Sequence, residues 1–148
     1  QGQAELSLFV PLEGVLTKRR IDWVPEGLPY LVDVKKVSGG EGGPDAFLKT
    51  MLARRYHVQA ASYLLGWNAL MGTTDPRSGF LFVVVEDEAP FLVAQYFVPQ
   101  QYLDKGEAVY LRDLNTYKRC VVQDYFPGFP SEPQELDVTE WALRKAER

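Results

Sequence analysis

Residues 20–35 read Arg-Ile-Asp-Trp-Val-Pro-Glu-Gly-Leu-Pro-Tyr-Leu-Val-Asp-Val-Lys, and the rest of the chain is organised around them. The Pro- and Gly-rich residues 25–29 have the composition of a turn, so the strand carrying Asp22 is expected to fold back beside the strand carrying Asp33. Side chains two apart on a strand share a face, which places Asp33 with Lys35 and directs Val32 and Val34 into apolar packing. The stretch therefore predicts two neighbouring strands that bring two carboxylates and one amine to one point.

Two carboxylates and an amine at one point have a chemical interpretation. Carboxylates that share a site repel each other unless a divalent cation compensates their charge. Hard oxygen ligands favour Mg²⁺ or Mn²⁺, which keep several waters and accept substrate phosphate as a further ligand. Lys35 can then orient the attacking water, help to deprotonate it, or offset charge on a pentacovalent phosphorus. The structural alternative is a solvated ion pair between Asp33 and Lys35, because an Asp-x-Lys motif alone also occurs without such chemistry.

Length and composition predict one globular domain. The 148 residues are enough to bury an ordinary core, and an apolar content of 46% with 13% aromatic residues argues against disorder. A net charge of −4 does not indicate a nucleic-acid-binding protein. The basic residues are nevertheless concentrated between residues 18 and 57, so a local positive surface is compatible with the acidic total.

The single cysteine, Cys120, excludes an internal disulfide and a cysteine-based zinc site. We therefore expect a reducing, intracellular setting. No apolar run approaches the roughly 18 residues of a membrane span, and no signal peptide is visible, so no membrane association is expected. Gln1 rather than Met stands first, and we expect the chain to be a piece of a longer protein.

The hydrophobic pattern predicts an α/β fold with a mixed, mainly antiparallel sheet of about five strands flanked by helices. Strands are expected at residues 4–10, 15–24, 30–37, 80–86 and 91–98. One helical region is expected from an N-cap at Asp45 to about Leu70, with a break at residues 54–56, and another from Pro99 to about Gln123. The glycine-rich residues 38–43 lack a nucleotide-binding fingerprint and are expected to form a mobile connector. An irregular tail with a short helix is expected over residues 127–148.

Helical spacing predicts which side of the first helical region faces the sheet. The residues expected on that side are Phe47, Met51, Val58, Ala61 and Leu65. Gln59 and Tyr63 lie four apart and share a neighbouring face.

Three segments, in this order, resemble the PD-(D/E)XK nuclease superfamily: Arg20-Ile21-Asp22, Asp33-Val34-Lys35, and residues 56–63 with the sequence Tyr-His-Val-Gln-Ala-Ala-Ser-Tyr. Within it, the chain is most similar to the exodeoxyribonuclease VIII (RecE) branch, which is related to phage lambda exonuclease and to the RecB nuclease domain. Residues 82–86, 117–120 and 125–129 also resemble that branch, so the similarity covers most of the chain. The resemblance implies a restriction-endonuclease-like core in a single domain over residues 1–148.

The resemblance also implies a metal site. Asp22 and Asp33 would bind Mg²⁺ or Mn²⁺ with the carbonyl of Val34 as a third ligand, and Lys35 would be the catalytic lysine. Relatives have an upstream helix whose His or Glu completes the metal site, and we expect this N-terminal helical part to be missing here. Glu5 would partly replace that ligand if the first strand runs beside Asp22, whereas the alternative for Glu5 is a solvated strand residue.

Five residues are candidates for contact with DNA. Gln59 and Tyr63 match the glutamine and tyrosine of the helix behind the site, where the family positions the DNA backbone or supports the lysine. Arg20 belongs to the first segment of the resemblance. Lys36 either contacts phosphate or lies in solvent, and Tyr56 either contacts phosphate or belongs to the core.

The implied activity is metal-dependent hydrolysis of DNA, from a 5′ end of linear duplex, leaving 3′ single strands for recombination. Relatives form homo-oligomeric rings, so the resemblance implies such a ring here. It also implies a single-strand annealing protein as a partner. The expected location is the cytoplasm of a bacterial or phage-infected cell. Two alternatives stay open. One is a catalytically incomplete module of the same fold that binds DNA or serves as an assembly subunit. The other is a nuclease for RNA or single strands, because phosphodiester chemistry reads the backbone rather than the base.

Overall fold

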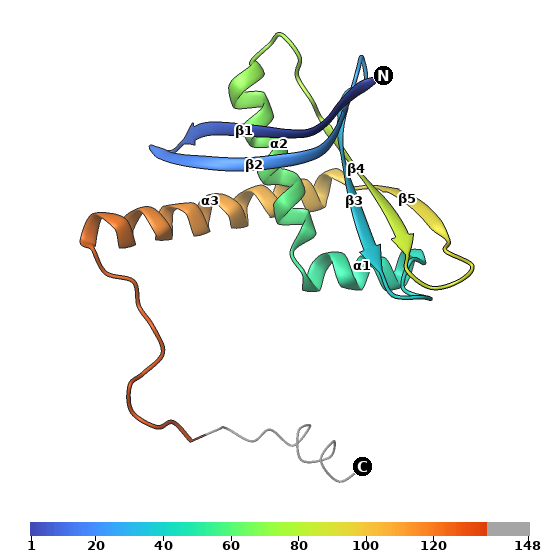
Figure 1. The fold of residues 1–148 in the computed structure, drawn as a ribbon. Helices are drawn as coiled ribbons and strands as arrows, with labels where there is room; N and C mark the ends of the chain where they lie inside the picture. Colours follow the sequence, from blue (N-terminus) through green and yellow to red (C-terminus); the bar gives the residue numbers. More distant parts are fainter. Residues whose placement is uncertain (136–148) are drawn as a thin grey trace.

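The computed structural model describes residues 1–135, in which five strands form one mixed sheet beside three helices (Figure 1). In sheet order the strands are β1 (Gly2–Leu12), β2 (Val15–Pro25), β3 (Tyr30–Val37), β4 (Gly79–Glu86) and β5 (Val93–Phe97). The helices are α1 (Pro44–Ala53), α2 (Tyr56–Met71) and α3 (Gln100–Gln123). Only β3 and β4 pair in parallel, and the other neighbours are antiparallel. The predicted α/β fold with a mixed sheet of about five strands is confirmed.

The helices α1 and α2 connect the parallel strands β3 and β4 and pack on one face of the sheet. The ring of Phe47 in α1 lies 5.7 Å from that of Phe82 in β4, and the ring of Tyr63 in α2 lies 6.0 Å from that of Phe80. Helix α3 packs on α2 at Gly106, where an added Cβ would lie 2.4 Å from a backbone oxygen of α2. Helix α2 is therefore held between the sheet and α3. No helix within residues 1–135 combines the length and apolarity needed to cross a membrane.

The strand β2 pairs with β3 only near its C-terminal end. It pairs with β1 along almost its whole length, from Gly2–Pro25 to Leu12–Val15, but with β3 only at Trp23–Val32. Figure 1 shows the β1–β2 hairpin running across the direction of β3 and β4. Beyond the Trp23–Val32 pair, the side of β3 that faces β2 therefore has no strand in its ladder.

The core lies between the sheet and the helices α1 and α2. Its fully buried side chains belong to three strands, β2, β3 and β4: Ile21, Leu31, Phe80, Phe82 and Val84. On the opposite face of β3, Val34 is 51% exposed. The prediction of apolar packing is thus confirmed for Val32, which is 7% exposed, and wrong for Val34.

The predicted break in the first helical region is confirmed, and it has a backbone cause. Arg55 adopts a left-handed conformation with φ of 57°, which ends α1 and begins α2. The predicted N-cap at Asp45 is wrong, because Gly43 is the N-cap and Pro44 opens α1. Proline suits a first helical position, since its missing N–H would have no partner there.

The break also changes which side of α2 faces the sheet. Phe47 and Met51 of α1 are buried as predicted, at 3% and 4% exposure. In α2, however, Ala61 packs against Gly106 of α3. The α2 residues that join the core are Ala60, Leu64 and Trp67, with Tyr56 and Tyr63 beside them. A period counted continuously across the break therefore assigned the wrong side of α2 to the sheet.

Two connecting segments differ from their predicted form. The glycine-rich residues 38–43 are anchored at Gly42, whose N–H donates to Glu86 Oε1 at 2.9 Å and whose carbonyl accepts from the Tyr96 hydroxyl at 2.7 Å. The fifth strand spans Val93–Phe97 rather than 91–98, and Phe91, two residues before it, has a φ of 58°, outside the extended range. The short helix predicted near the C-terminus lies outside the described residues.

Candidate active site

Three side chains close a ring of polar contacts at the centre of β3. Asp33 and Lys35 point to the same face because they lie two apart on the strand, and α2 brings Gln59 to them. The Lys35 ammonium lies 2.5 Å from Asp33 Oδ2 and donates to Gln59 Oε1 at 2.9 Å. The Gln59 amide nitrogen donates to Asp33 Oδ1 at 2.8 Å. Gln59 therefore binds both members of the Asp33–Lys35 pair and fixes their relative position.

Two aromatic rings complete the surroundings of the Lys35 ammonium. Its nitrogen lies 4.4 Å from the centre of the Tyr56 ring and 5.7 Å from that of Phe82. An ammonium over an aromatic face is attracted by the negative potential of the ring. The Lys35 side chain is only 14% exposed, so this attraction acts with little competition from water. The role of Phe82 was missed because a phenylalanine in an apolar strand gives no sequence signal for a site.

Asp22 joins the cluster through the backbone of β3. The Val34 N–H donates to Asp22 Oδ2 at 2.8 Å. This bond forms where β2 has separated from β3, so a side chain of β2 takes the place of a ladder partner. The N–H and C=O of one strand residue point to the same side, so the Val34 carbonyl is directed toward the same gap between the strands.

The carboxyl group of Asp33 is buried inside the cluster. It is 2% exposed, and this burial raises its pKa above the ordinary value. The hydrogen bond and charge of Lys35 oppose the rise, the negative charge of Asp22 adds to it, and the bond from Gln59 opposes it again. Asp33 Oδ2 lies in an ion pair with the Lys35 ammonium, and Oδ1 accepts from Gln59. A buried carboxylate beside a second carboxylate is a group that a further cation would stabilise.

The donor set suits a hard divalent cation. The carboxylates of Asp22 and Asp33 and the carbonyl of Val34 are oxygen ligands of the kind that Mg²⁺ and Mn²⁺ prefer. Among residues 1–135, no three Asp, Glu, His or Cys side chains are grouped closely enough to hold a metal. Glu5, the candidate for a further ligand, lies on β1 between the residues paired with Trp23 and Ile21, but its carboxylate forms an ion pair with Arg20.

The predicted DNA-contacting residues fall into two groups. Arg20 and Lys36 are exposed, and Lys36 forms an ion pair of 3.0 Å with Asp87, a partner that the sequence did not reveal. The other three point inward. Gln59 and Tyr56 contact Lys35, and Tyr63 packs its ring at the edge of the core. The side-chain amide of Gln59 is thus hydrogen-bonded to both Lys35 and Asp33.

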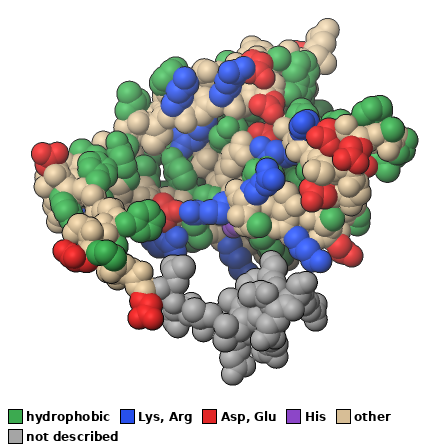
Figure 2. All heavy atoms as spheres, turned by 60° about the horizontal axis from the view of Figure 1, so that its bottom comes forward, with side chains coloured by type: hydrophobic (Ala, Val, Ile, Leu, Met, Phe, Trp, Pro, Cys, Tyr) green, Lys and Arg blue, Asp and Glu red, His purple; other side chains and the backbone are tan. Residues whose placement is uncertain are grey.

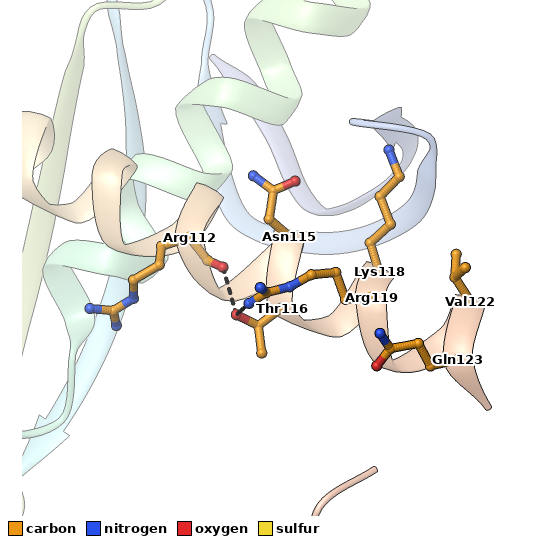
Figure 3. A pocket seen from close by; sticks show the side chains of 7 residues that line it. All are labelled: Arg112, Asn115, Thr116, Lys118, Arg119, Val122 and Gln123. Atoms are coloured by element: carbon orange, nitrogen blue, oxygen red, sulfur yellow. Dashed lines mark hydrogen bonds between the residues drawn. The ribbon is translucent and has the colours of Figure 1, made fainter. Parts of the chain in front are cut away.

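Basic and acidic side chains are mixed on one face of the molecule. Figure 2 shows Lys and Arg side chains across the middle of this face, with acidic side chains between them and toward the margins. A separate hollow lies along the second half of α3 and shares no residue with the cluster on β3 (Figure 3). It is lined by Arg112, Asn115, Thr116, Lys118, Arg119, Val122 and Gln123.

Comparison with known proteins supports the likeness of the fold. The family model of a "PDDEXK-like domain of unknown function (DUF3799)" matches residues 1–135. The crystal structure of a protein described as "Putative exonuclease" from Eubacterium rectale superimposes with a TM-score of 0.68 at 15% identity, over 96% of this chain and 56% of that one. A structure named SSO0001 superimposes with a TM-score of 0.42 at 13% identity, over 75% of this chain and 50% of that one. No curated protein matches the sequence.

This chain thus spans just over half of the Eubacterium rectale protein. The likeness to that protein shows the fold, and the predicted restriction-endonuclease-like core is confirmed. The family match covers most of the chain and includes β2, β3 and α2, which carry the cluster. The chain therefore belongs to the PDDEXK-like domain family DUF3799, within the PD-(D/E)XK superfamily.

Proposed function

We propose that this protein is a metal-dependent nuclease that hydrolyses phosphodiester bonds of DNA at Asp22, Asp33 and Lys35. One observation carries the proposal. The buried carboxylate of Asp33 lies against a lysine held by Gln59, next to a second carboxylate on the neighbouring strand. A solvated ion pair, the structural alternative, would be exposed and would need no glutamine to bind both partners.

Each residue of the cluster has a distinct part in this proposal. Asp22, Asp33 and the carbonyl of Val34 would hold the cation. When bound, such a cation lowers the pKa of an attacking water and bears charge on the leaving group. The Lys35 ammonium would donate to a phosphate oxygen on which charge develops, and Gln59 would keep that ammonium in place.

The finer features of the activity are also proposals. The Eubacterium rectale protein is described as an exonuclease, and the sequence resembles the exodeoxyribonuclease VIII branch. We therefore propose degradation of linear duplex from 5′ ends, by a homo-oligomeric ring that works with a single-strand annealing protein in recombination. A linear duplex labelled at either 5′ or 3′ ends, compared with a closed circle, tests this assignment. Cleavage of the circle, or release of the 3′ label first, would contradict it.

The test of the nuclease itself uses two pairs of variants. Purified protein is incubated with linear duplex and Mg²⁺ or Mn²⁺, and Asp33→Ala and Lys35→Ala are expected to abolish cleavage while circular dichroism stays unchanged. Asp45→Ala and Lys49→Ala provide a matched acid and lysine on α1, outside the cluster, and should cleave normally. The proposal fails if neither ion supports cleavage by this chain or by a longer protein that contains it.

A second candidate function is a nuclease-fold module without catalysis, which binds DNA or serves as an assembly subunit. It is favoured by the pairing of Glu5 with Arg20, which diverts the carboxylate of Glu5 from the cluster. Calorimetry separates the two candidates. A nuclease should bind Mn²⁺, and Asp22→Asn should weaken that binding by about tenfold, or ~1.4 kcal/mol. A non-catalytic module should bind neither Mg²⁺ nor Mn²⁺, and its affinity for DNA should be the same in the wild type and in Asp22→Asn.

A further inference from the structure

The β1–β2 hairpin has a buried face and an exposed face. Its inner side chains, which include Leu8, Val10, Arg19 and Ile21, are buried, and Arg19 contacts α2 through the Ser62 carbonyl. The alternate residues point away from α2. Among them, Ser7 lies opposite Arg20 and Phe9 lies opposite Lys18 in the antiparallel register, and all four are exposed. We call these four residues the hairpin face.

The hairpin face combines an aromatic ring with two cations. The Phe9 side chain is 59% exposed. The Lys18 ammonium lies 5.4 Å from the centre of its ring. The Arg20 side chain is 65% exposed, and its ion pair with Glu5 lies at the surface, where such pairs contribute little and exchange readily.

These groups complement a nucleic-acid strand. Lysine and arginine contact phosphates, and an exposed aromatic ring offers a platform for the flat face of a base. In a duplex the bases are stacked on one another and paired, so a ring standing on a strand surface finds a free base face only in a single strand. The combination therefore favours single-stranded over duplex nucleic acid.

The position of the hairpin face connects it with the site. Arg20 and Asp22 are two apart on β2, a separation of about 7 Å along a strand. Because the β2 residues before Trp23 do not pair with β3, the hairpin extends away from the cluster across α2, and Lys118 of α3 donates to the Glu13 carbonyl at its turn (Figure 1). A strand lying on the hairpin face would lead directly to Asp22.

We propose that the hairpin face binds a single-stranded segment of the substrate, with the Phe9 ring stacked on a base and with Lys18 and Arg20 on neighbouring phosphates. This proposal rests on the proposed function only in taking nucleic acid as the substrate. It assigns a strand-binding surface outside the metal cluster. Strand binding there requires no metal and can be measured without cleavage.

The test is fluorescence anisotropy in EDTA with a labelled oligothymidine and with a duplex of equal length. The wild-type protein should bind the single strand more tightly than the duplex. Phe9→Leu should weaken single-strand binding by about tenfold, as expected for one stacked base, and Phe9→Trp should retain it. Lys18→Gln and Arg20→Gln should each lower the slope of log K against log salt by about 0.7.

Matched controls use exposed residues elsewhere. Phe129→Leu removes a fully exposed aromatic ring, and Lys105→Gln removes a cation of α3, and both should bind like the wild type. The surface assignment is overturned if the wild type does not bind the single strand, if Phe9→Leu binds it normally, or if Phe9→Leu weakens both DNAs equally. Cleavage measured in parallel separates the proposals. If the wild type binds the single strand as expected but cleaves no DNA, only the nuclease proposal is overturned. If Phe9→Leu cleaves DNA and binds the single strand like the wild type, only the hairpin-face proposal is overturned.

Discussion

The ammonium nitrogen of Lys35 lies 4.4 Å from the centre of the Tyr56 ring. This contact predicts that Tyr56 positions the lysine through its aromatic face, because no hydrogen bond of its hydroxyl contributes to the arrangement. Tyr56→Leu should lower kcat by about tenfold with little change in KM, and Tyr56→Phe should cleave like the wild type. NMR provides a direct readout, since ring-current shifts of the Lys35 ε-methylene should persist in Tyr56→Phe and vanish in Tyr56→Leu. Equal losses of activity in both variants would instead assign the role to the hydroxyl.

The bridging amide of Gln59 predicts a cost in stability. Gln59→Leu leaves Asp33 Oδ1 without its donor and Lys35 without one acceptor in a largely buried setting. An unsatisfied buried group costs about 1–3 kcal/mol, so urea unfolding should show a loss of that size. Gln100→Leu removes the exposed bond of 2.8 Å between Gln100 and Asp104 and should cost less than about 0.5 kcal/mol. If Gln59→Leu lowers the free energy of unfolding by no more than Gln100→Leu does, the hydrogen bonds of Gln59 add no stability.

The close contact between α2 and α3 predicts a strong effect at Gly106. A Cβ there would lie 2.4 Å from the His57 carbonyl oxygen, a backbone atom that cannot rotate away. Gly106→Ala should destabilise the protein by about 2–3 kcal/mol through overpacking, despite the higher helix propensity of alanine. Gly43→Ala is the control, because nothing lies within 4 Å of its added Cβ. If both variants melt like the wild type, the two helices are not in contact at Gly106.

The ion pairs of Asp113 predict a pH-dependent contribution to stability. Hydrogen bonds from Arg55 and then Arg112 lower the pKa of Asp113 below its ordinary value of 3.8. A carboxylate with a lowered pKa stabilises the fold above that ordinary value, and the stabilisation is lost as the pH falls through the lowered pKa. Because the Asp113 side chain is 40% exposed, Asp113→Asn should cost less than about 1 kcal/mol at pH 7.

The measurement for Asp113 is urea unfolding of both proteins between pH 7 and pH 3. The difference between wild type and Asp113→Asn should shrink below pH 3.8 and in 1 M NaCl, which screens exposed charges. A difference that stays constant across this range would indicate packing rather than charge.

The sequence predicted the strand elements of the site well because they depend on local alternation. Asp33 and Lys35 share a face of β3 for the simple reason that they are two residues apart. The turn at residues 25–29 brings β2 back to β3, as its Pro and Gly content predicted. These features require only the period of a strand and the chemistry of a turn.

The helical side of the site was harder to predict. The left-handed Arg55 interrupts the helical period, so the rotation of α2 relative to α1 cannot be counted from the sequence. For this reason the sequence left two roles open for Tyr56, a core residue or a phosphate contact. Its contact with Lys35 depends on how α2 packs on the sheet. The exposure of Val34 likewise depends on which face of the sheet the helices cover. The alternation of side chains along a strand does not predict this tertiary property.

The single residue pair between β2 and β3 also has an evolutionary consequence. Because the hairpin is joined to β3 only at Trp23–Val32, its length is not tied to the register of β3 and β4. Residues added in pairs on either side of the Glu13–Gly14 turn would lengthen the hairpin and keep its two faces, while Asp22 stayed beside Val34. The length of this hairpin can therefore change in evolution without moving Asp22, Asp33 or Lys35.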